Sequence, residues 1–570
     1  MLFNGFQGLF VRDSEMPESF TDAEKQLLHE YCSNLDKNVF VLKNLPEAVK
    51  GALFSRYSRS AKGLRRLLLD EFISNPELGF SELVAKSKES HAEGVINKQK
   101  ADDFFVRILD GYGDDSVGEL GGCHIALENI SNVATKIIED ARLGGSPLEK
   151  STRYVFFDQK ADGKYLFYEE PTIMASEFRK EYLELMNFLF DTYTELVQPL
   201  KAFMEKRFAI EEFSFMVDLK TRREEKFSNI TDPEVQKRSR GAYNASIRAK
   251  VCDVLRGLLP ASTLTNMGLY GNGRFFEYLL RKLYSNPLSE MRVLGKEMHQ
   301  ELDTQISSFV RRAKMDDYLA QTPKVVEMRV KQFLPGHSVD SKKPVALVDF
   351  EANAEDKIVS YCLFSQSEHS FSEIQSMVQQ MSPAQKKEIL SAYVGNRRSR
   401  RDKPGRAFEN TYYTFEILAD FGIYRDLQRH RVLTQERQLL STLHGFDLPV
   451  EISEAGFEKK FSECMKRADA LYRKIAEKMP LEAQYCVPMA YNIRWYMTLN
   501  LREAFHLIEL RSTKQGHESY RRIVQLMFKE IKRVHPLFAS FMNFVDLNKY
   551  SLSRLDAEMK QEHKRAEWKK

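Results

Sequence analysis

The feature that most constrains the fold of this chain is an internal repeat. Four residues that are polar or that break helices recur 228 positions further along the sequence. The four pairs are Pro260 and Pro488, Asn272 and Asn500, Arg274 and Arg502, and Glu290 and Glu518. Upstream, Glu119 and Glu409 lie in comparable segments 290 positions apart, so the first copy carries about sixty additional residues between its two blocks. A constant offset at several such positions indicates a duplicated domain.

Most of the sequence has the periodicity of amphipathic helices. Apolar residues recur three and four positions apart over 176–207, 457–479 and 500–534, which places them on one face of a helix. Short runs at Tyr154–Asp158 and Pro344–Phe350 have instead the aromatic or β-branched composition of strands. These patterns predict an α-rich member of the α+β fold class.

Turn-forming residues mark the boundary between the two copies. The stretch PGHSVDSKKP at 335–344 is typical of a linker between structured segments. We therefore expect a helical N-terminal extension at 1–60, a first copy at 61–334, the linker at 335–344 and a second copy at 345–570. The additional residues of the first copy are expected to form a helical insert around 160–243.

Composition restricts the classes of function. The chain has 85 basic and 81 acidic side chains, and this excess is too small to indicate a nucleic acid polymer as a partner. Its six cysteines are scattered without a C-x-x-C pair, which argues against a disulfide framework and against a thiolate metal site. No stretch approaches the roughly eighteen uncharged apolar residues of a membrane helix. We expect a cytoplasmic protein with no membrane segment and no metal site.

The strongest candidate for a functional site is Arg429-His430-Arg431. Two guanidinium groups beside an imidazole form a set of donors that suits a phosphate or the carbonyl groups of a flavin ring. The alternative interpretation is a solvated basic turn. Upstream, Phe408–Phe415 alternates polar and aromatic residues, a pattern that predicts a strand.

This arrangement resembles the flavin-dependent thymidylate synthases. Their motif is R-H-R, seven residues and a serine, preceded by a strand with the pattern G-H-x-S-x-x-E-H and followed by a leucine–proline turn, N-x-R and a later arginine. The second copy matches this pattern at Glu409, Arg429, His430, Arg431, Pro488, Asn500, Arg502 and Arg511. It departs from the pattern where Asn410 replaces a histidine, where Leu439 replaces the serine with Ser441 two residues beyond, and where the S-x-R-Y tail is absent.

The first copy departs from the same family in the complementary way. Gly113–Leu120 resembles the upstream strand without its two histidines, and Glu139-Asp140-Ala141, followed by Arg142, takes the place of R-H-R. The tail of the motif survives here as Glu149-Lys150-Ser151-Thr152-Arg153-Tyr154. In the family this tail binds the phosphate and sugar of the nucleotide. The resemblance therefore implies that each copy supplies a different part of one site.

The resemblance further implies two tandem synthase-like domains, each with long helices packed on a small antiparallel sheet. The implied reaction is the reductive methylation of dUMP to dTMP, with methylenetetrahydrofolate as carbon donor, FAD as hydride carrier and NADPH as reductant. It assigns catalysis to Arg429, His430, Arg431 and Arg511. It assigns flavin binding to the R-H-R residues with Glu409, Asn410, Asn500, Arg502 and His506, and dUMP binding to Glu149, Ser151, Arg153, Tyr154 and Arg511.

Members of the family are homotetramers with sites between subunits. A tandem chain is therefore expected to form a homodimer that rebuilds the four-unit assembly. Two other functions remain open: a nucleotide- or flavin-binding descendant without the reaction, and a flavoenzyme that acts on another pyrimidine.

A second basic segment, Asn396–Arg406, contains six basic residues among turn formers. It precedes Glu409, so it is expected to face flavin or nucleotide phosphates or the glutamate tail of a folate. A solvated run of charges is an equally open interpretation.

Overall fold

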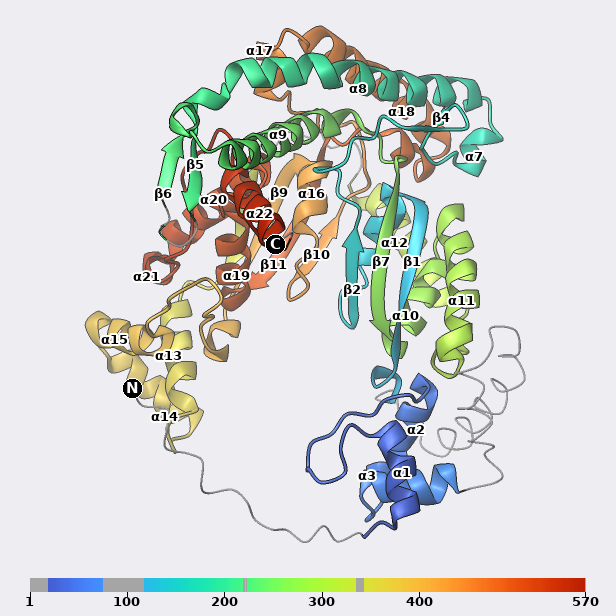
Figure 1. Cartoon of the computed structure of the whole chain (residues 1–570), viewed down its shortest axis with the longest axis vertical. Coiled ribbons are helices and arrows are strands. Elements are labelled where there is room, and N and C mark those ends of the chain that lie inside the picture. The colour runs from blue at the N-terminus through green and yellow to red at the C-terminus, as the bar shows by residue number, and fades with distance from the viewer. Residues whose placement is uncertain (1–18, 75–116, 219–220, 222, 335–342, 569–570) are drawn as a thin grey trace.

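The computed structural model describes residues 19–74, 117–218, 221, 223–334 and 343–568 (Figure 1). Each copy has its own antiparallel sheet with helices packed on it, which confirms the α-rich α+β class. Most of the predicted linker, 335–342, and residues 113–116 of the predicted upstream strand lie outside the described residues. A continuous hydrophobic core runs through both copies.

The first copy is built on a three-stranded sheet with the strand order β1-β7-β2. Its elements are β1 (Gly122–Ser131), α6 (Asn132–Glu139), β2 (Gly145–Glu149), β7 (Leu264–Asn272), α10 (Gly273–Tyr284) and α11 (Ser289–Val310). Asn272 ends β7 and caps α10, because its side chain accepts a hydrogen bond from the amide of Phe275.

The second copy is built on a four-stranded sheet with the strand order β10-β11-β9-β8. Its elements are β8 (Val345–Phe350), β9 (Tyr412–Asp420), α16 (Phe421–Leu427), β10 (Thr434–Arg437), β11 (Asn492–Asn500), α19 (Leu501–Arg511) and α20 (Glu518–Val534). β10, β11 and β9 correspond to β2, β7 and β1. β8 is the strand predicted at 344–350, and it has no counterpart among the described residues of the first copy.

The registers of the two sheets reproduce the offsets found in the sequence. Gly122 lies opposite Asn272 in the first sheet, and Tyr412 lies opposite Asn500 in the second. β1 has an irregularity between Leu127 and Ile130 that makes it one residue longer than β9. When this additional residue is counted, residues 140–142 are equivalent to 429–431. The comparison of sequences alone had placed the equivalent residues one position earlier, at 139–141.

The insert of the first copy covers the end of the molecule where the two copies meet. Its elements are β3 (Lys160–Ala161), β4 (Lys164–Tyr165), α7 (Pro171–Met174), α8 (Arg179–Arg207), β5 (Ser214–Asp218) and β6 (Arg223–Lys226). α9 (Pro233–Leu255), part of which was predicted to belong to the insert, instead corresponds at the offset of 228 to the helix at 458–478 of the second copy. In Figure 1, α8 and α9 run above both sheets, and α8 packs on α18 (Glu458–Lys478) of the second copy. The helices predicted at 176–207 and 457–479 are confirmed. The strand predicted at Tyr154–Asp158 is wrong, since Tyr154 ends a turn and the residues after it have no regular secondary structure.

Further helices surround the two copies. α1 (Asp22–Tyr31), α2 (Glu47–Tyr57) and α3 (Leu64–Leu67) lie below the first sheet, and α13 (Ala354–Phe364), α14 (Phe371–Gln380) and α15 (Pro383–Val394) lie below the second (Figure 1). The remaining helices are α12 (Asp317–Phe333), α17 (Val450–Glu454), α21 (Pro536–Ser540) and α22 (Leu555–Trp568). None of the helices described here combines the length and hydrophobicity that crossing a bilayer requires.

The two copies meet through the repeated proline. Pro260 and Pro488 form an antiparallel bridge. The amide of Ala261 donates to the carbonyl oxygen of Val487, and the amide of Met489 donates to that of Leu259, each at 2.9 Å. Because these two hydrogen bonds join equivalent residues in opposite directions, the copies are related by a pseudo-two-fold axis, as in an isologous dimer.

Candidate functional site

His430 lies at the centre of the R-H-R segment that follows α16, and only 5% of its surface is exposed. Its Nδ1 lies 2.8 Å from a carboxylate oxygen of Glu503 on α19. Nε of Arg511, at the end of the same helix, donates to its Nε2 at 2.9 Å. Since Nε2 accepts a hydrogen bond, the imidazole is neutral with its proton on Nδ1. Burial and the neighbouring Arg511 keep the pKa of His430 well below its usual value.

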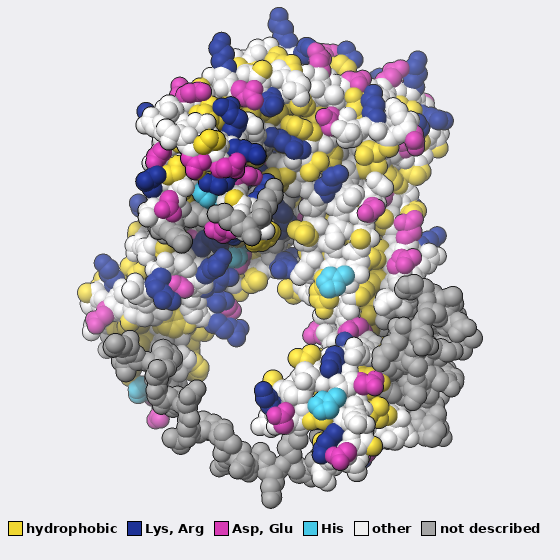
Figure 2. Space-filling model, in the orientation of Figure 1, with side chains coloured by type: hydrophobic (Ala, Val, Ile, Leu, Met, Phe, Trp, Pro, Cys, Tyr) yellow, Lys and Arg dark blue, Asp and Glu magenta, His cyan; other side chains and the backbone are white. Residues whose placement is uncertain are grey.

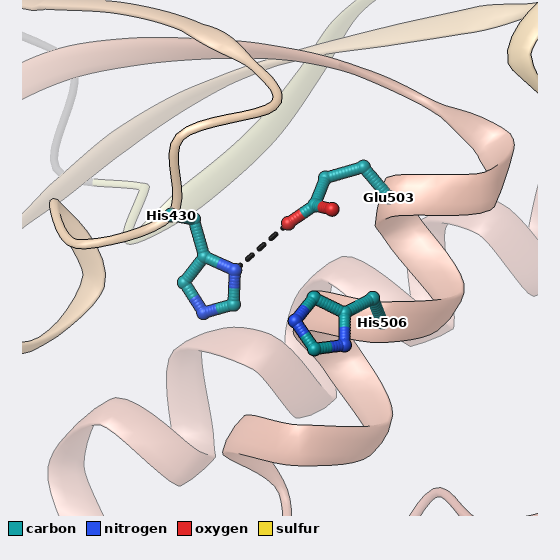
Figure 3. A group of neighbouring side chains, drawn as sticks. All are labelled: His430, Glu503 and His506. Atoms are coloured by element: carbon teal, nitrogen blue, oxygen red, sulfur yellow. Dashed lines mark hydrogen bonds and ion pairs between the residues drawn. The ribbon is translucent and has the colours of Figure 1, made fainter. Parts of the chain in front are cut away.

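His506, one helical turn from Arg502, completes a group of three side chains that point toward one another (Figure 3). The ligand atoms of His430, Glu503 and His506 all lie within 4.8 Å of one another, a spacing that a metal ion accepts. The surrounding charge opposes this use, because burial and the cations Lys403 and Arg400 lower the pKa of His506 to about 4. Positive charge of this kind repels a metal ion and attracts an anion, so the structure favours an anionic ligand here.

The two arginines of the R-H-R segment point away from His430. Arg429 pairs with Asp426 at 3.2 Å, and Asp426 also pairs with Arg256 of the first copy at 2.9 Å. Burial would raise the pKa of Asp426, but Arg256 and neighbouring arginines hold it far below its usual value. Arg431 reaches across to the first copy and donates to the carbonyl oxygen of Gly145 on β2 at 2.6 Å. The R-H-R segment is thus part of the junction between the copies.

A cavity opens beside these arginines at the junction. Both copies contribute charged groups to its wall, and the first copy also contributes apolar groups. The lining residues are Ile138, Glu139, Arg142, Gly145, Pro147, Leu269, Phe275, Gln428, Arg429 and Arg431. The space inside it is about 10 Å³, enough for about one water molecule, so the cavity is not a ligand pocket in this conformation.

Arg153 brings the surviving tail of the first copy to the same region. Its guanidinium binds both carboxylate oxygens of Asp253, at 2.7 and 3.1 Å. It also lies over the ring of Tyr520, 5.5 Å from the centroid, and Arg511 of the second copy lies 5.8 Å from the same centroid. The hydroxyl of Ser151 accepts a hydrogen bond from the amide of Arg153 at 3.2 Å. One predicted phosphate ligand from each copy therefore contacts the same ring.

Two other residues predicted to bind substrate lie in different surroundings. Glu149 belongs to a buried ion cluster, where it binds Arg425 at 2.6 Å and Lys136 at 3.0 Å. Burial alone would raise the pKa of Glu149, but these two cations lower it to about 2. Tyr154 is 54% exposed, and its ring is covered on one side by the guanidinium of Arg554 at 4.1 Å. Glu149 thus joins the two copies, and Tyr154 lies outside the group around Tyr520.

The remaining residues predicted to bind flavin lie at the start of α19. The side chain of Asn500 accepts a hydrogen bond from the amide of Glu503 at 2.8 Å and caps the helix. Arg502 pairs with Glu409 at 3.0 Å. Glu409 and Asn410 lie in a 3-10 turn before β9, so the strand predicted over 408–415 begins only at residue 412. The side-chain amide of Asn410 donates to a backbone carbonyl within this turn.

Sequence reasoning missed several residues that organise the site. They are Asp253, Arg256, Asp426, Glu503, His517 and Tyr520. His517 is buried beside Asp253, and burial together with Arg256 lowers its pKa to about 3. Asp253 and Arg256 lie three residues apart at the end of α9, and only their position at the junction distinguishes them from other helix-surface charges.

Comparison with known proteins agrees with this architecture. The family model described as thymidylate synthase complementing protein matches residues 80–306 and 346–537. The UPF0159 protein of Chlamydia pneumoniae is 45% identical over 96% of this chain and 98% of its own length. The UPF0159 protein of Thermoplasma acidophilum is 35% identical over 90% of this chain and 98% of its own length.

Two further matches are partial. The flavin-dependent thymidylate synthase of Sulfolobus acidocaldarius is 29% identical over 26% of this chain and 63% of its own length. A solved structure of the UMP/dUMP methylase PolB from Streptomyces cacaoi, bound with 5-Br dUMP, aligns with 16% identity and a TM-score of 0.28, over 35% of this chain and 94% of that chain. The two family regions, one in each copy, show that this chain belongs to the thymidylate synthase complementing protein family and carries the family domain twice.

Proposed function

We propose that this protein catalyses the reductive methylation of dUMP to dTMP, with FAD as hydride carrier, methylenetetrahydrofolate as carbon donor and NADPH as reductant. The observation that carries the proposal is the meeting of Arg153 from the first copy with Arg511 from the second over Tyr520. Each copy has lost part of the family motif, and the parts that remain lie together at the junction.

The nucleotide phosphate is assigned to the arginines around Tyr520. Burial and the nearby Arg429 lower the pKa of Arg511, so this guanidinium is held where its charge is unfavourable. Its nitrogen partner, His430, is neutral and supplies no compensating charge. A phosphate would offset this cost through charge-assisted hydrogen bonds. Asp253 would keep Arg153 oriented toward the same ligand.

The donor set of the R-H-R segment fits a flavin. Bound FAD would carry the hydride, while the protein would supply orientation and electrostatics. The residues proposed to hold it are Arg429, His430, Arg431, Glu409, Asn410, Asn500, Arg502 and His506. Glu503 would hold His430 in the tautomer whose Nε2 accepts a hydrogen bond from Arg511. The guanidinium groups of Arg429 and Arg431, which flank His430 in the sequence, remain charged donors.

Catalysis would come from the same arginines. As C5 of the pyrimidine becomes nucleophilic, negative charge develops on the ring carbonyl oxygens, and fixed cationic donors stabilise that charge. Arg429 is held in place by Asp426 and borders the cavity at the junction. It is therefore our candidate for this role.

The assembly proposed for the active protein is a homodimer. The pseudo-two-fold axis at Pro260 and Pro488 gives one chain the symmetry of a dimer of family domains, so two chains would supply four domains. Light scattering coupled to size-exclusion chromatography measures this directly, and a monomer in solution would contradict it.

Rescue of a thymidine-requiring bacterial strain tests the whole proposal. The gene should restore growth without thymidine, and its Arg429→Ala variant should not. The purified protein should bind FAD and convert dUMP to dTMP when supplied with methylenetetrahydrofolate and NADPH. Binding of FAD without this product, in assays with dUMP and other pyrimidines, would contradict the reaction but not the flavin site.

A further inference from the structure

The basic loop Asn396–Arg406 is held in one conformation beside the candidate site. Arg397 is buried beneath the loop, where it donates to the carboxylate of Glu509 at 2.8 Å. The carboxylate of Asp402 accepts hydrogen bonds from the backbone amides of Arg398 and Ser399, at 2.8 and 3.1 Å. These contacts fix the course of the backbone, so the other basic side chains project from a rigid support.

Several of these side chains form no salt bridge, although Lys403 acts electrostatically on Glu503. Among the residues that the structure describes, no hydrogen bond or ion pair involves the side-chain nitrogens of Arg400, Arg401 or Lys403. The pairs formed by Arg398 and Arg406 are exposed and long, at 3.9 and 3.4 Å, and contribute little to stability. A fixed loop with this much uncompensated positive charge repels itself and attracts an anion.

The loop borders the candidate site directly. Arg502 of α19 donates to the carbonyl oxygen of Pro404 at 2.7 Å, which fastens the loop to the helix that carries His506. Lys403 and Arg400 act electrostatically on His506, whose ring centroid lies 5.5 Å from that of His430. In Figure 2, dark-blue side chains border the central opening of the molecule on the side of the second copy.

We propose that the Asn396–Arg406 loop binds the anionic tail of a ligand whose reactive end lies at Arg429-His430-Arg431. Arg401 and Lys403 are exposed whereas His430 is buried, so the loop contacts the part of the ligand that remains at the solvent edge. A row of cations along a loop matches a chain of phosphates or carboxylates.

Two ligands of the proposed reaction carry such a tail, so this inference rests on that function. FAD has a pyrophosphate, and a polyglutamylated folate has a chain of γ-linked carboxylates. The folate monoglutamate keeps the ring system and lacks the added glutamates, whereas riboflavin keeps the flavin ring and lacks both the pyrophosphate and the adenosine of FAD. The contribution of the loop is therefore measured by the change of each affinity ratio between the wild type and the variant.

The test variant is Arg400→Ala/Arg401→Ala/Lys403→Ala. The matched control, Lys237→Ala/Lys459→Ala/Lys466→Ala, removes the same charge from exposed positions on α9 and α18. Dissociation constants are measured at one ionic strength for FAD, riboflavin, pteroylpolyglutamate and its monoglutamate. We expect the test variant to bind one tailed ligand about tenfold more weakly, as the loss of several exposed charge contacts predicts. Affinity for the matched ligand without a tail and the thermal unfolding midpoint should not change.

A loss confined to FAD assigns the loop to the pyrophosphate, and a loss confined to the polyglutamate assigns it to the carboxylates. If both ratios in the test variant equal those of the wild type, or if the control variant loses as much, the inference is wrong. Wild-type protein that binds none of the four ligands would overturn the proposed function together with this inference. Wild-type binding with unchanged ratios overturns the inference alone.

Discussion

The two copies share a scaffold but differ in the charged side chains at their equivalent places. Both retain an asparagine that caps the helix after the central strand, Asn272 and Asn500. Both retain the ion pair between that helix and the preceding 3-10 turn, Glu119 with Arg274 at 2.8 Å and Glu409 with Arg502 at 3.0 Å. These repeated contacts hold helix ends and turns in place, so they are needed wherever the domain fold is needed.

The charged residues around Tyr520 have no such counterparts. At the places related by the pseudo-two-fold axis, the ion-pairing arginines and acids are replaced by apolar or uncharged residues. The pairs are Arg153 and Ser441, Asp253 and Leu481, Arg256 and Gln484, Asp426 and Ile137, His430 and Ala141, and Arg511 and Leu283. Arg429 is replaced by an acid, Asp140. One of the two equivalent places therefore has the cationic side chains proposed to bind an anion, and the other does not.

The place without the anion site has a closed hydrogen-bond network instead. The buried carboxylate of Glu290 accepts from the amide and hydroxyl of Ser131 and from the hydroxyl of Tyr485, at 2.8, 2.6 and 2.7 Å. Its repeat counterpart, Glu518, is 61% exposed at its side chain and lies 3.4 Å from Lys250. A network whose acceptors are already occupied adds rigidity to the junction but offers no donors to a phosphate.

The largest effect is expected from a change of Arg429, and a change of its counterpart, Asp140, tests whether the two equivalent places differ in function. Arg429→Ala should lower kcat/KM for dUMP by at least about a hundredfold, as loss of a preorganised donor does elsewhere. Asp140→Asn at the equivalent place keeps an acceptor for the side chain of Gln428, which precedes Arg429, and should lower it by less than about fivefold. Steady-state kinetics on both variants, with melting curves to verify the fold, measures the difference. Similar losses in both would show that the copies are functionally equivalent.

Arg153→Ala removes the arginine that the first copy contributes to the proposed phosphate site. The KM for dUMP should rise about ten- to a hundredfold while FAD remains bound, since one charge-assisted phosphate contact is worth about 1.5–3 kcal/mol. Asp253 would lose its partner, so the double change Arg153→Ala/Asp253→Asn is needed to separate binding from stability. Ser441→Ala is the matched control at the equivalent buried position of the second copy. Unchanged dUMP kinetics in both Arg153 variants would exclude a shared site.

The asymmetry also predicts how many ligands one chain binds. Isothermal titration with dUMP should give one site per chain, because only one of the two places has the arginines. Two equal sites per chain would show that Asp140-Ala141-Arg142 replaces R-H-R without loss of binding. A single site that disappears in Arg511→Ala would locate it in the second copy.

The smallest effect concerns Glu503, whose repeat counterpart is Phe275. Burial raises the pKa of Glu503 to about 7. Because this value exceeds that of an unfolded chain, the carboxyl contributes stability fully below about pH 4, and the contribution is lost as the pH rises through 7. Chemical denaturation between pH 5 and 8 should therefore show wild-type stability falling by about 1–3 kcal/mol relative to Glu503→Gln. Parallel curves for the two proteins would mean that Glu503 titrates normally.

The sequence determined the duplicated architecture because the repeat is carried by residues with local structural roles. Prolines in the turn and asparagines at helix ends act within a few residues of themselves, so their spacing survives as a constant offset. The helices at 176–207 and 457–479 were predictable for the same reason, since periodicity is a local property. The strands predicted to begin near Glu409 and at Tyr154 were not predictable in this way, because the residues of a turn and of a strand start have similar composition there.

Only the tertiary structure decided which of the candidate residues lie together. The motif placed Arg153 and Arg511 in different copies, but their meeting over Tyr520 depends on the pseudo-two-fold packing at Pro260 and Pro488. Asp253 lies near the end of α9, where no motif distinguishes it from other acids on a helix. Its role as the partner of Arg153 follows from a contact between residues 100 positions apart, and such contacts depend on how whole elements pack rather than on local sequence.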